Sequence, residues 1–387
     1  MRILEISLEA PSYNSGGGIG IIQSLFSLSK CGIVDYIGPK IDEAIENQIK
    51  INKSFYLNYD KRWPKRLLGL KKGIVSGYCY SLLDTLNGID FKQYDFVHIE
   101  FSKYPYLIKL SKKNGVKTLV RMHNVEKDYY LNQYKNKKTI ANFLQSRFFS
   151  RMERRSVKMA DSLICLTQTD IDRVHSLYEN ITKSIYCNPV CITDKNVGDL
   201  NQKKANYFLI TGSLWFGPNA DGILWFLREV WSSFSAMDQY CNFKLVIAGS
   251  RPNNDIISAS SALKNVVLLS NPAEMSDLFL NAFAYVAPIF SGAGMKVKIA
   301  EALMYGLPIL STDHAMVGYV DSDSIYRCNT KEQFINSMRS TISNTPDDYE
   351  RICIASRKVY LDNYSIDSSS RMYQKIFTKE KINDDIG

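Results

Sequence analysis

The sequence predicts an α/β protein with two doubly wound domains of similar size. Short β-rich segments alternate with longer helical segments, which is typical of a parallel sheet with helices on both faces. A polar stretch at 188–206 interrupts this alternation, which then starts again. The length of 387 residues also suits two domains better than one core.

Each half of the chain contributes its own set of strands. In the first half we expect strands at 2–8, 95–101, 117–122 and 161–167, and helices at 21–30, 106–113 and 141–160. In the second half we expect strands at 207–214, 243–250, 265–270, 284–290 and 308–312. Helices are expected at 219–234, at 298–306 and through most of the chain from 330 onward. In the first of these, Ile223, Phe226, Leu227 and Val230 share one face. The second is expected to end at Gly306.

These elements predict the domain boundaries. We expect a first domain at 1–187, a linker at 188–206 and a second domain at 207–365. The last segment, 366–387, is expected to be a helix that returns to the first domain.

Positive charge is concentrated in the first half. The net charge of the chain is +9, and residues 1–200 hold 30 basic and 20 acidic residues against 18 and 19 in residues 201–387. Such a surface could face nucleic acid, an anionic membrane or a phosphorylated substrate, or it could simply be a basic, well-solvated surface.

The cysteines and the hydropathy indicate a cytoplasmic protein. None of the eight cysteines forms a CxxC pair and most lie in apolar runs, so we expect a reducing compartment, no disulfide framework and no metal. The N-terminus lacks the apolar core of a signal peptide, and no stretch approaches the roughly 20 apolar residues that span a bilayer. A peripheral position on the inner membrane fits these features as well.

The segment 288–312, PIFSGAGMKVKIAEALMYGLPILST, is the strongest candidate for a binding site. A strand leads into a turn of small residues around Gly292 and Gly294, and a helix is expected to begin near Met295. Glycines allow close backbone approach to a ligand, and the free amides at a helix start attract phosphate. Lys296 and Lys298 are unfavourable at the positive end of a helix unless an anion is bound there.

Glu301 lies seven residues beyond Gly294, about 10 Å along the helix. This separation is close to that between the pyrophosphate and the ribose of a nucleotide, and a carboxylate can accept hydrogen bonds from both ribose hydroxyls. We place Lys298, Glu301 and Tyr305 on the ligand side of this helix. The alternative is that Glu301 is an ordinary exposed helix residue.

Several segments together resemble the retaining family 4 glycosyltransferases (glycosyl transferases group 1). They are LVRMHNVEKDY (119–129), MERRSVKMADSLICLTQTDIDRV (152–174), ITGSLWFGPNADGILWFLREVW (210–231), LVIAGSRP (245–252) and the 288–312 segment. The resemblance implies the GT-B fold, with two Rossmann-like domains facing across a cleft. It also implies transfer of a sugar from a nucleotide-sugar donor without a metal or another cofactor.

The resemblance also implies roles in the donor site. Glu301 would be the ribose-binding second glutamate of an E-x7-E pair, whose first glutamate is replaced here by Ala293. The amides of Gly294, Met295 and Lys296 would then contact the sugar or the phosphates. The residues expected to bind the donor are Gly212, Arg251, Gly292, Gly294, Met295, Lys296, Lys298 and Glu301. The Arg and Lys pair that usually follows the Gly212 strand in the family is absent from this sequence. Lys298 and Arg251 are the favoured partners of the diphosphate.

The first domain offers three further candidates. Gly16, Gly17 and Gly18 follow the first strand, and the resemblance places them beside the donor phosphates and the acceptor, although a flexible turn is the alternative. The resemblance places His123 against the transferred sugar, and with Glu301 it forms the expected catalytic pair. Glu100 is a candidate contact of the acceptor.

The segment 59–73, YDKRWPKRLLGLKKG, predicts contact with an anionic membrane surface, because basic residues alternate with apolar ones. A solvated loop is the alternative, and no nucleic-acid-binding signature is present. We expect a glycosyltransferase that acts on a glycan acceptor, linked to a lipid diphosphate, in O-antigen or capsule synthesis. The alternatives are a nucleotide-sugar epimerase or hydrolase of the same fold, or a non-catalytic nucleotide-sugar-binding scaffold.

Overall fold

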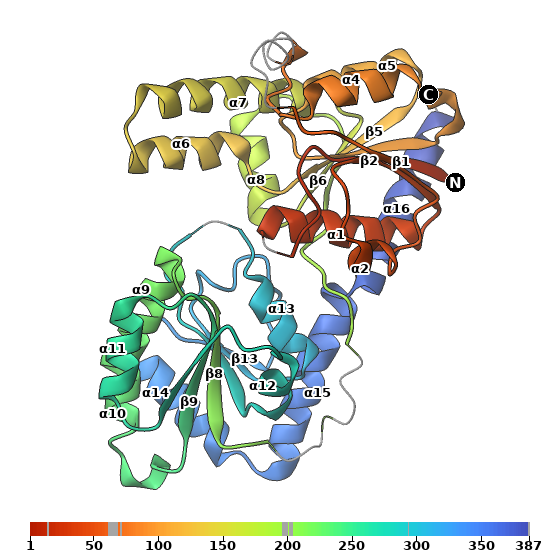
Figure 1. The fold of residues 1–387 in the computed structure, drawn as a ribbon. Coiled ribbons are helices and arrows are strands. Elements are labelled where there is room, and N and C mark those ends of the chain that lie inside the picture. The colour runs from red at the N-terminus through yellow and green to blue at the C-terminus, as the bar shows by residue number, and fades with distance from the viewer. Residues whose placement is uncertain are drawn as a thin grey trace. The chain divides into compact units, whose positions relative to one another are not determined.

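The computed structural model describes residues 1–13, 15–60, 69, 72–195, 200, 204–292 and 294–385, with side chains to residue 382. The chain forms two compact units. One unit contains Met1–Cys191 and Ile366–Gly387, and the other contains Ile192–Ser365. Each unit is built on a parallel sheet (Figure 1). The expected α/β class with two doubly wound domains is therefore confirmed.

The first unit has a seven-stranded sheet in the order β3-β2-β1-β4-β5-β6-β7. Its strands are β1 (Arg2–Ile6), β2 (Ile33–Gly38), β3 (Lys53–Tyr56), β4 (Phe96–Glu100), β5 (Lys117–Met122), β6 (Ser162–Cys165) and β7 (Ile185–Cys187). Its helices are α1 (Gly16–Ser29), α2 (Glu43–Glu46), α4 (Cys79–Asn87), η1 (Phe91–Gln93), α5 (Pro105–Lys113), α6 (Glu126–Asn136), α7 (Ile140–Met159), α8 (Gln168–Leu177) and α16 (Ile366–Asp385).

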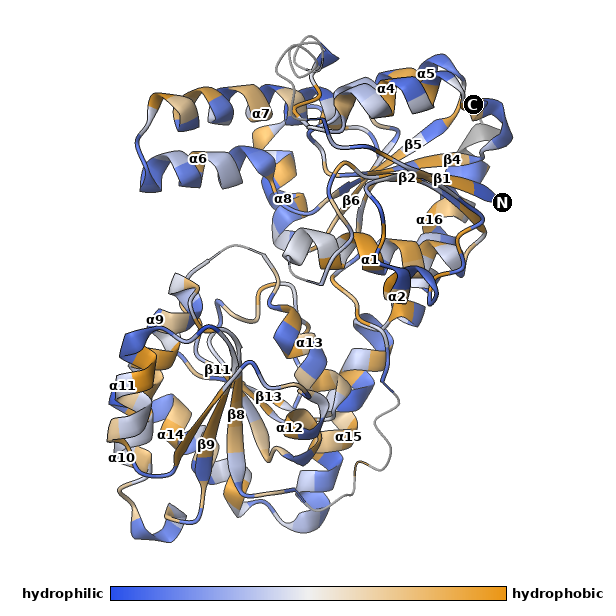
Figure 2. Cartoon of the chain, viewed as in Figure 1, coloured by the Kyte–Doolittle hydropathy of each residue, from blue (hydrophilic) through white to orange (hydrophobic). Residues whose placement is uncertain are grey.

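Helix α16 belongs to the core of the first unit although it ends the chain. It lies with α1 on one face of the sheet, while α5 and α7 cover the other face (Figure 1). Phe377 of α16 packs against Phe96 of β4, with ring centroids 4.8 Å apart. The strands of the sheet are mostly hydrophobic and the outer faces of the helices are mixed (Figure 2).

The second unit has a six-stranded sheet in the order β10-β9-β8-β11-β12-β13. Its strands are β8 (Tyr207–Ser213), β9 (Lys244–Ser250), β10 (Val266–Ser270), β11 (Ala284–Ala287), β12 (Ile309–Ser311) and β13 (Ile325–Arg327). Its helices are α9 (Gly217–Trp225), η2 (Phe226–Trp231), α10 (Ser232–Phe234), η3 (Asp238–Tyr240), α11 (Asn254–Ala262), α12 (Ser276–Asn281), α13 (Val297–Met304), α14 (Lys331–Ser343) and α15 (Pro346–Asn363).

Both sheets reverse their direction of winding in the middle, between β1 and β4 in the first unit and between β8 and β11 in the second. Ligands of doubly wound sheets bind outside the carboxyl ends of the strands at such switch points. The glycine-rich segments of both units follow a strand at this point. Among the described residues, no helix combines the length and the hydropathy needed to cross a bilayer.

Candidate functional site

The switch point of the second unit brings backbone segments into close contact. A Cβ atom on Gly222 of α9 would lie 1.8 Å from the carbonyl oxygen of Pro288, directly after β11. A Cβ atom on Gly292 would lie 3.3 Å from Pro218 Cγ, at the start of α9. These glycines let helix α9 and the loop after β11 lie against each other at the carboxyl end of the sheet.

The loop before α13 is longer than the sequence predicted. Gly292 and Gly294 have φ values of +97° and +75°, in the left-handed region that favours glycine. Helix α13 therefore begins at Val297 rather than at Met295, whose side chain is buried. The Lys296 amine donates hydrogen bonds to the carbonyl oxygens of Gly292 and Gly294, at 3.3 and 2.8 Å.

Two further side chains hold this loop from outside it. His314 Nε2 lies 2.7 Å from the carbonyl oxygen of Gly292. The Tyr319 hydroxyl donates to the carbonyl oxygen of Lys296 at 2.9 Å and accepts from the Ala300 amide at 3.2 Å. The first turn of α13 is thereby fixed before any ligand binds. Burial also lowers the pKa of Lys296.

Glu301 is partly accessible near the middle of α13. Its side chain is 24% exposed, and Oε2 lies 2.7 Å from Lys298 Nζ. Ile299 and Leu303 of the same helix are fully buried. The placement of Tyr305 on the ligand side is wrong, because its side chain is 3% exposed and stacks on Phe279 with centroids 5.3 Å apart.

Arg251 follows the carboxyl end of β9 and is exposed. Its guanidinium lies 4.7 Å from the ring centroid of Trp215, which follows β8. Gly212, near the end of β8, faces the Asn219 amide, which donates to the carbonyl oxygen of Ser213 at 3.2 Å. Sequence reasoning missed Trp215, although an aromatic residue directly after a strand at the switch point was a usable signal.

In the first unit the three glycines form the first turn of α1 rather than a loop before it. The Ser15 side chain caps the helix by accepting a hydrogen bond from the Gly18 amide at 3.1 Å. A Cβ atom on Gly18 would lie 2.7 Å from the Ser12 amide nitrogen, whereas a Cβ atom on Gly16 would have no neighbour within 4 Å. Gly18 thus allows the preceding loop to fold back onto the helix.

His123 is enclosed by three neighbours and is 7% exposed. Its ring stacks on Phe101 with centroids 4.1 Å apart, and Nε2 contacts a carboxylate oxygen of Glu100. A Cβ atom on Gly20 would lie only 2.4 Å from His123 Cε1. Glu100 is fully buried. This structure therefore gives Glu100 the role of orienting His123 and offers no exposed oxygen of Glu100 to an acceptor.

Glu100 belongs to a buried network of charged and polar side chains. Burial alone would raise its pKa, but the hydrogen bond and electrostatic interaction with His123, with smaller contributions from His98 and Arg121, outweigh burial and hold the pKa at about 2. Arg121 lies opposite Glu100 in the pairing of β4 and β5, and it is fully buried. The carboxylate is therefore ionised, with a fixed orientation.

The network continues toward α16. Glu5 of β1 hydrogen-bonds His98 Nδ1, and His98 Nε2 lies 3.0 Å from the Tyr373 hydroxyl. Glu5, His98 and Glu100 are close enough to hold a metal ion. His98 already bonds Glu5, however, and the cationic Arg121 lies beside Glu100, so the arrangement fits a hydrogen-bonded network around a buried Arg–Glu pair better.

Two features discussed from the sequence fall on positions outside the described part of the chain. Residue 293, where the first glutamate of the pair is missing, and residues 61–68, 70 and 71 of the basic segment lie outside the described residues.

Comparison with known proteins defines the class of the chain. The model of the family described as "Glycosyl transferases group 1" matches residues 205–344. This range contains the whole loop and helix around Gly292 and Glu301. Together with the two parallel-sheet units, the match makes the chain an enzyme of the glycosyltransferase class.

A curated relative and a solved structure are similar to most of the chain. A Klebsiella pneumoniae protein named "Uncharacterized 44.6 kDa protein in cps region" is 24% identical over 344 residues, which are 80% of this chain and 82% of that protein. A glycosyltransferase from Rickettsia africae ESF-5 is 14% identical with a TM-score of 0.67, covering 98% of both chains.

Two other solved structures are similar. Anabaena Alr3699/HepE in complex with UDP is 11% identical with a TM-score of 0.64, covering 98% of this chain and 100% of that one. WaaG, a glycosyltransferase involved in lipopolysaccharide biosynthesis, is 16% identical with a TM-score of 0.62, covering 97% and 99%. At these identities the structures show the fold, which is GT-B.

Proposed function

We propose that this protein transfers a sugar, with retention of configuration and without a metal, from a nucleotide-sugar to a lipid-diphosphate-linked glycan at the inner membrane. The product would be a bacterial surface polysaccharide, such as O-antigen or capsule. Support comes from the cps region in the name of the Klebsiella relative and from the involvement of WaaG in lipopolysaccharide biosynthesis. The UDP in the Anabaena structure supports a nucleotide-sugar donor.

The arrangement of the loop and α13 carries the proposal. The amides of Val297 and Lys298 begin the helix and so have no intrahelical acceptor. Such amides, with the helix dipole, stabilise a phosphate group. The Lys298 amine lies at the same end of the helix, and within the described part of the chain it forms an ion pair only with Glu301.

Glu301 would hold the ribose of the nucleotide. One carboxylate oxygen lies 2.7 Å from Lys298 Nζ, and the side chain is 24% exposed. The carboxylate can therefore accept hydrogen bonds from a diol while the Lys298 amine turns toward the phosphates. Negative charge develops on the departing diphosphate during transfer, so the amides and the amine would stabilise the transition state most.

The first unit would bind the acceptor. Glu100 and Phe101 hold the His123 ring in one orientation next to Gly20 of α1. In the retaining mechanism that the resemblance implies, a phosphate oxygen of the donor takes the proton of the acceptor hydroxyl. His123 would then contact the transferred sugar and need not act as a base.

A panel of nucleotide-sugars tests the donor. We expect one of the UDP-, GDP-, TDP- or CMP-sugars to raise the melting temperature, because a ligand at 100 times its Kd stabilises the folded state by about 2.7 kcal/mol. The free monosaccharides serve as controls. A melting temperature that responds to none of the nucleotide-sugars would contradict the proposal.

Turnover of the stabilising donor then separates the alternatives. Transfer to a lipid-linked acceptor supports the proposed reaction, whereas turnover without any acceptor would indicate an epimerase or hydrolase. The absence of the first glutamate, at Ala293, favours a non-catalytic scaffold as the second candidate. That candidate predicts donor binding without transfer to any acceptor.

A further inference from the structure

Helices α6 and α7 form a basic hairpin at one side of the first unit. They lie side by side in Figure 1, and α7 has 20 residues, about 30 Å in length. Residues 126–159 contain nine basic and three acidic side chains, a net charge of +6. The role proposed for His123 and Glu301 uses none of these residues.

The acidic side chains of the hairpin do little to neutralise its surface. Glu126 and Glu153 are buried. Glu153 accepts hydrogen bonds from the amides of Glu126 and Lys127, at 2.5 and 3.2 Å, and from the Tyr178 hydroxyl at 2.5 Å. Its charge thereby caps the start of α6 and fixes the two helices to each other. The third acid, Asp128, pairs with Arg173 of α8.

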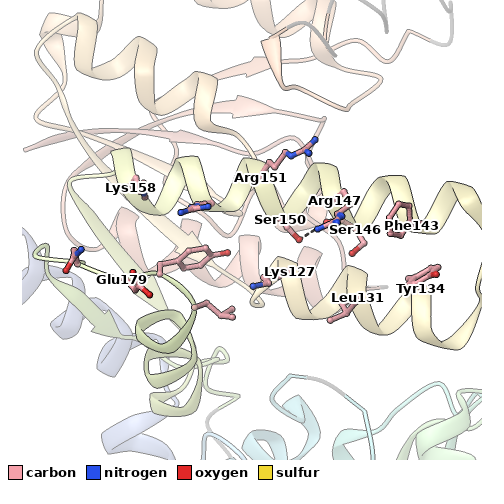
Figure 3. A pocket seen from close by; sticks show the side chains of 14 residues that line it. Lys127, Leu131, Tyr134, Phe143, Ser146, Arg147, Ser150, Arg151, Lys158 and Glu179 are labelled. Carbon is pink, nitrogen blue, oxygen red and sulfur yellow. Dashed lines mark hydrogen bonds between the residues drawn. The ribbon is translucent and has the colours of Figure 1, made fainter.

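A cavity of about 690 Å³ lies between α6, α7 and the segment after α8 (Figure 3). Its walls carry five basic side chains and one acidic side chain, Glu179. The basic ones are Lys127, Arg147, Arg151, Arg154 and Lys158. Within the described part of the chain, no ion pair joins any of these five to a carboxylate, so their charge is available to an anion.

The start of α7 presents apolar side chains beside this charge. Ile140 is 81% exposed and Leu144 is 60% exposed, the two highest values among the large hydrophobic residues described. They are four residues apart and so lie on one face of the helix. Phe143, 41% exposed, is adjacent to them, and Lys137 and Lys138 precede them directly.

We propose that the α6–α7 tip, residues 135–147, docks on an anionic bilayer. Ile140, Phe143 and Leu144 would enter the boundary between headgroups and acyl chains, and the basic residues would bind lipid phosphates. This surface is distinct from the 59–73 segment predicted from the sequence. The proposal supplies the membrane contact of the proposed function and rests on that function for its biological purpose.

Other partners explain only part of this surface. A soluble phosphate or a nucleic acid would use the cations but would leave Ile140 and Leu144 in water. A second copy of the chain would cover the apolar residues but would bring two hairpins of charge +6 together. A bilayer with anionic lipids provides both an apolar layer and negative charge at its surface.

Vesicle flotation of the full-length protein tests the proposal. We expect binding to phosphatidylglycerol vesicles, weaker binding at high salt, and little binding to phosphatidylcholine vesicles. The double substitution Ile140→Ser/Leu144→Ser should reduce the partition coefficient about tenfold or more, because it removes the apolar insertion. Both side chains are exposed, so the variant should fold, and circular dichroism checks this.

The matched control is Ile354→Ser/Leu361→Ser on α15, where the side chains are 50% and 41% exposed. This control should float like the wild type. Equal flotation of the tip variant and the wild type would overturn the proposal, as would equal binding to the two lipids or a tip-dependent dimer in sedimentation. Melting temperatures with nucleotide-sugars test the donor site separately, so failure of one proposal is distinguishable from failure of the other.

Discussion

Substitution of Gly20 by alanine should displace the His123 ring. The new Cβ would lie 2.4 Å from His123 Cε1 and 2.8 Å from Nδ1. Since carbon atoms in good contact are about 3.5–4.0 Å apart, the ring would have to retreat by roughly 1 Å. Phe101 stacks on its face and Glu100 holds its Nε2, so retreat breaks favourable contacts.

We expect Gly20→Ala to destabilise the first unit by about 1–3 kcal/mol, which is typical of overpacking. For a domain of this size the melting temperature should fall by roughly 2–12 °C. Gly16→Ala is the matched control, because it lies in the same helix and its Cβ would have no neighbour within 4 Å. Its melting temperature should stay the same or rise slightly.

A double-mutant cycle with His123→Ala identifies the cause. Removal of the imidazole leaves the buried Glu100 carboxylate without its closest hydrogen-bond partner, which should itself cost about 1–3 kcal/mol. In that background Gly20→Ala should be neutral or slightly stabilising, because the collision is gone. An equal fall in melting temperature with and without His123 would refute this reasoning.

Two other substitutions test specific contacts. Burial, together with repulsion from Glu153, raises the pKa of Glu126 to about 7 despite the nearby Lys103. The folded state therefore favours the protonated form of Glu126. The stability that this preference contributes is fully present below pH 4.5 and is lost as the pH rises to about 7. Denaturant unfolding should show Glu126→Gln flattening that decline, and an unchanged slope would contradict it. Tyr319→Phe removes the hydroxyl that bonds the Lys296 carbonyl oxygen and the Ala300 amide. It should therefore lower the unfolding free energy by about 1 kcal/mol and weaken donor binding in calorimetry. An unchanged unfolding free energy and an unchanged Kd would contradict this.

The fold was largely predictable because buried parallel strands are continuous apolar runs. The strand at 117–122 is β5 as observed, and 207–214 differs from β8 by one residue. Strand β2 was missed because Asp35 interrupts its apolar run. The structure shows Asp35 buried and bonded to the Arg2, Asn52 and Tyr94 side chains, which the sequence could not indicate.

Helix starts were less predictable, because glycine has opposite roles at the two sites. The three glycines at 16–18 join α1, since Ser15 caps them, although glycine usually disfavours a helix. Gly294 instead adopts a positive φ and delays α13 to Val297. Neither outcome follows from local composition.

The buried network of the first unit depends on strand pairing and was not predicted. Glu5 and His98 are 93 residues apart in sequence but pair across β1 and β4. Alternating charged residues in β4, His98 and Glu100, were a partial signal that one face of the sheet is polar. The helical pattern, by contrast, indicated the partial exposure of Glu301 and Lys298, although the same pattern misplaced the buried Tyr305.

In the proposed function, α13 and its preceding loop bind the nucleotide, with Glu301 on the ribose. Titration calorimetry with UDP, or with the nucleoside diphosphate that stabilises the protein most, tests this directly. Loss of hydrogen bonds to a charged group costs about 1.5–3 kcal/mol, so Glu301→Gln should raise Kd about 10- to 100-fold. Asp362→Asn, which breaks another exposed ion pair of the same unit, should leave Kd unchanged. Equal Kd values for Glu301→Gln and the wild type would contradict the account.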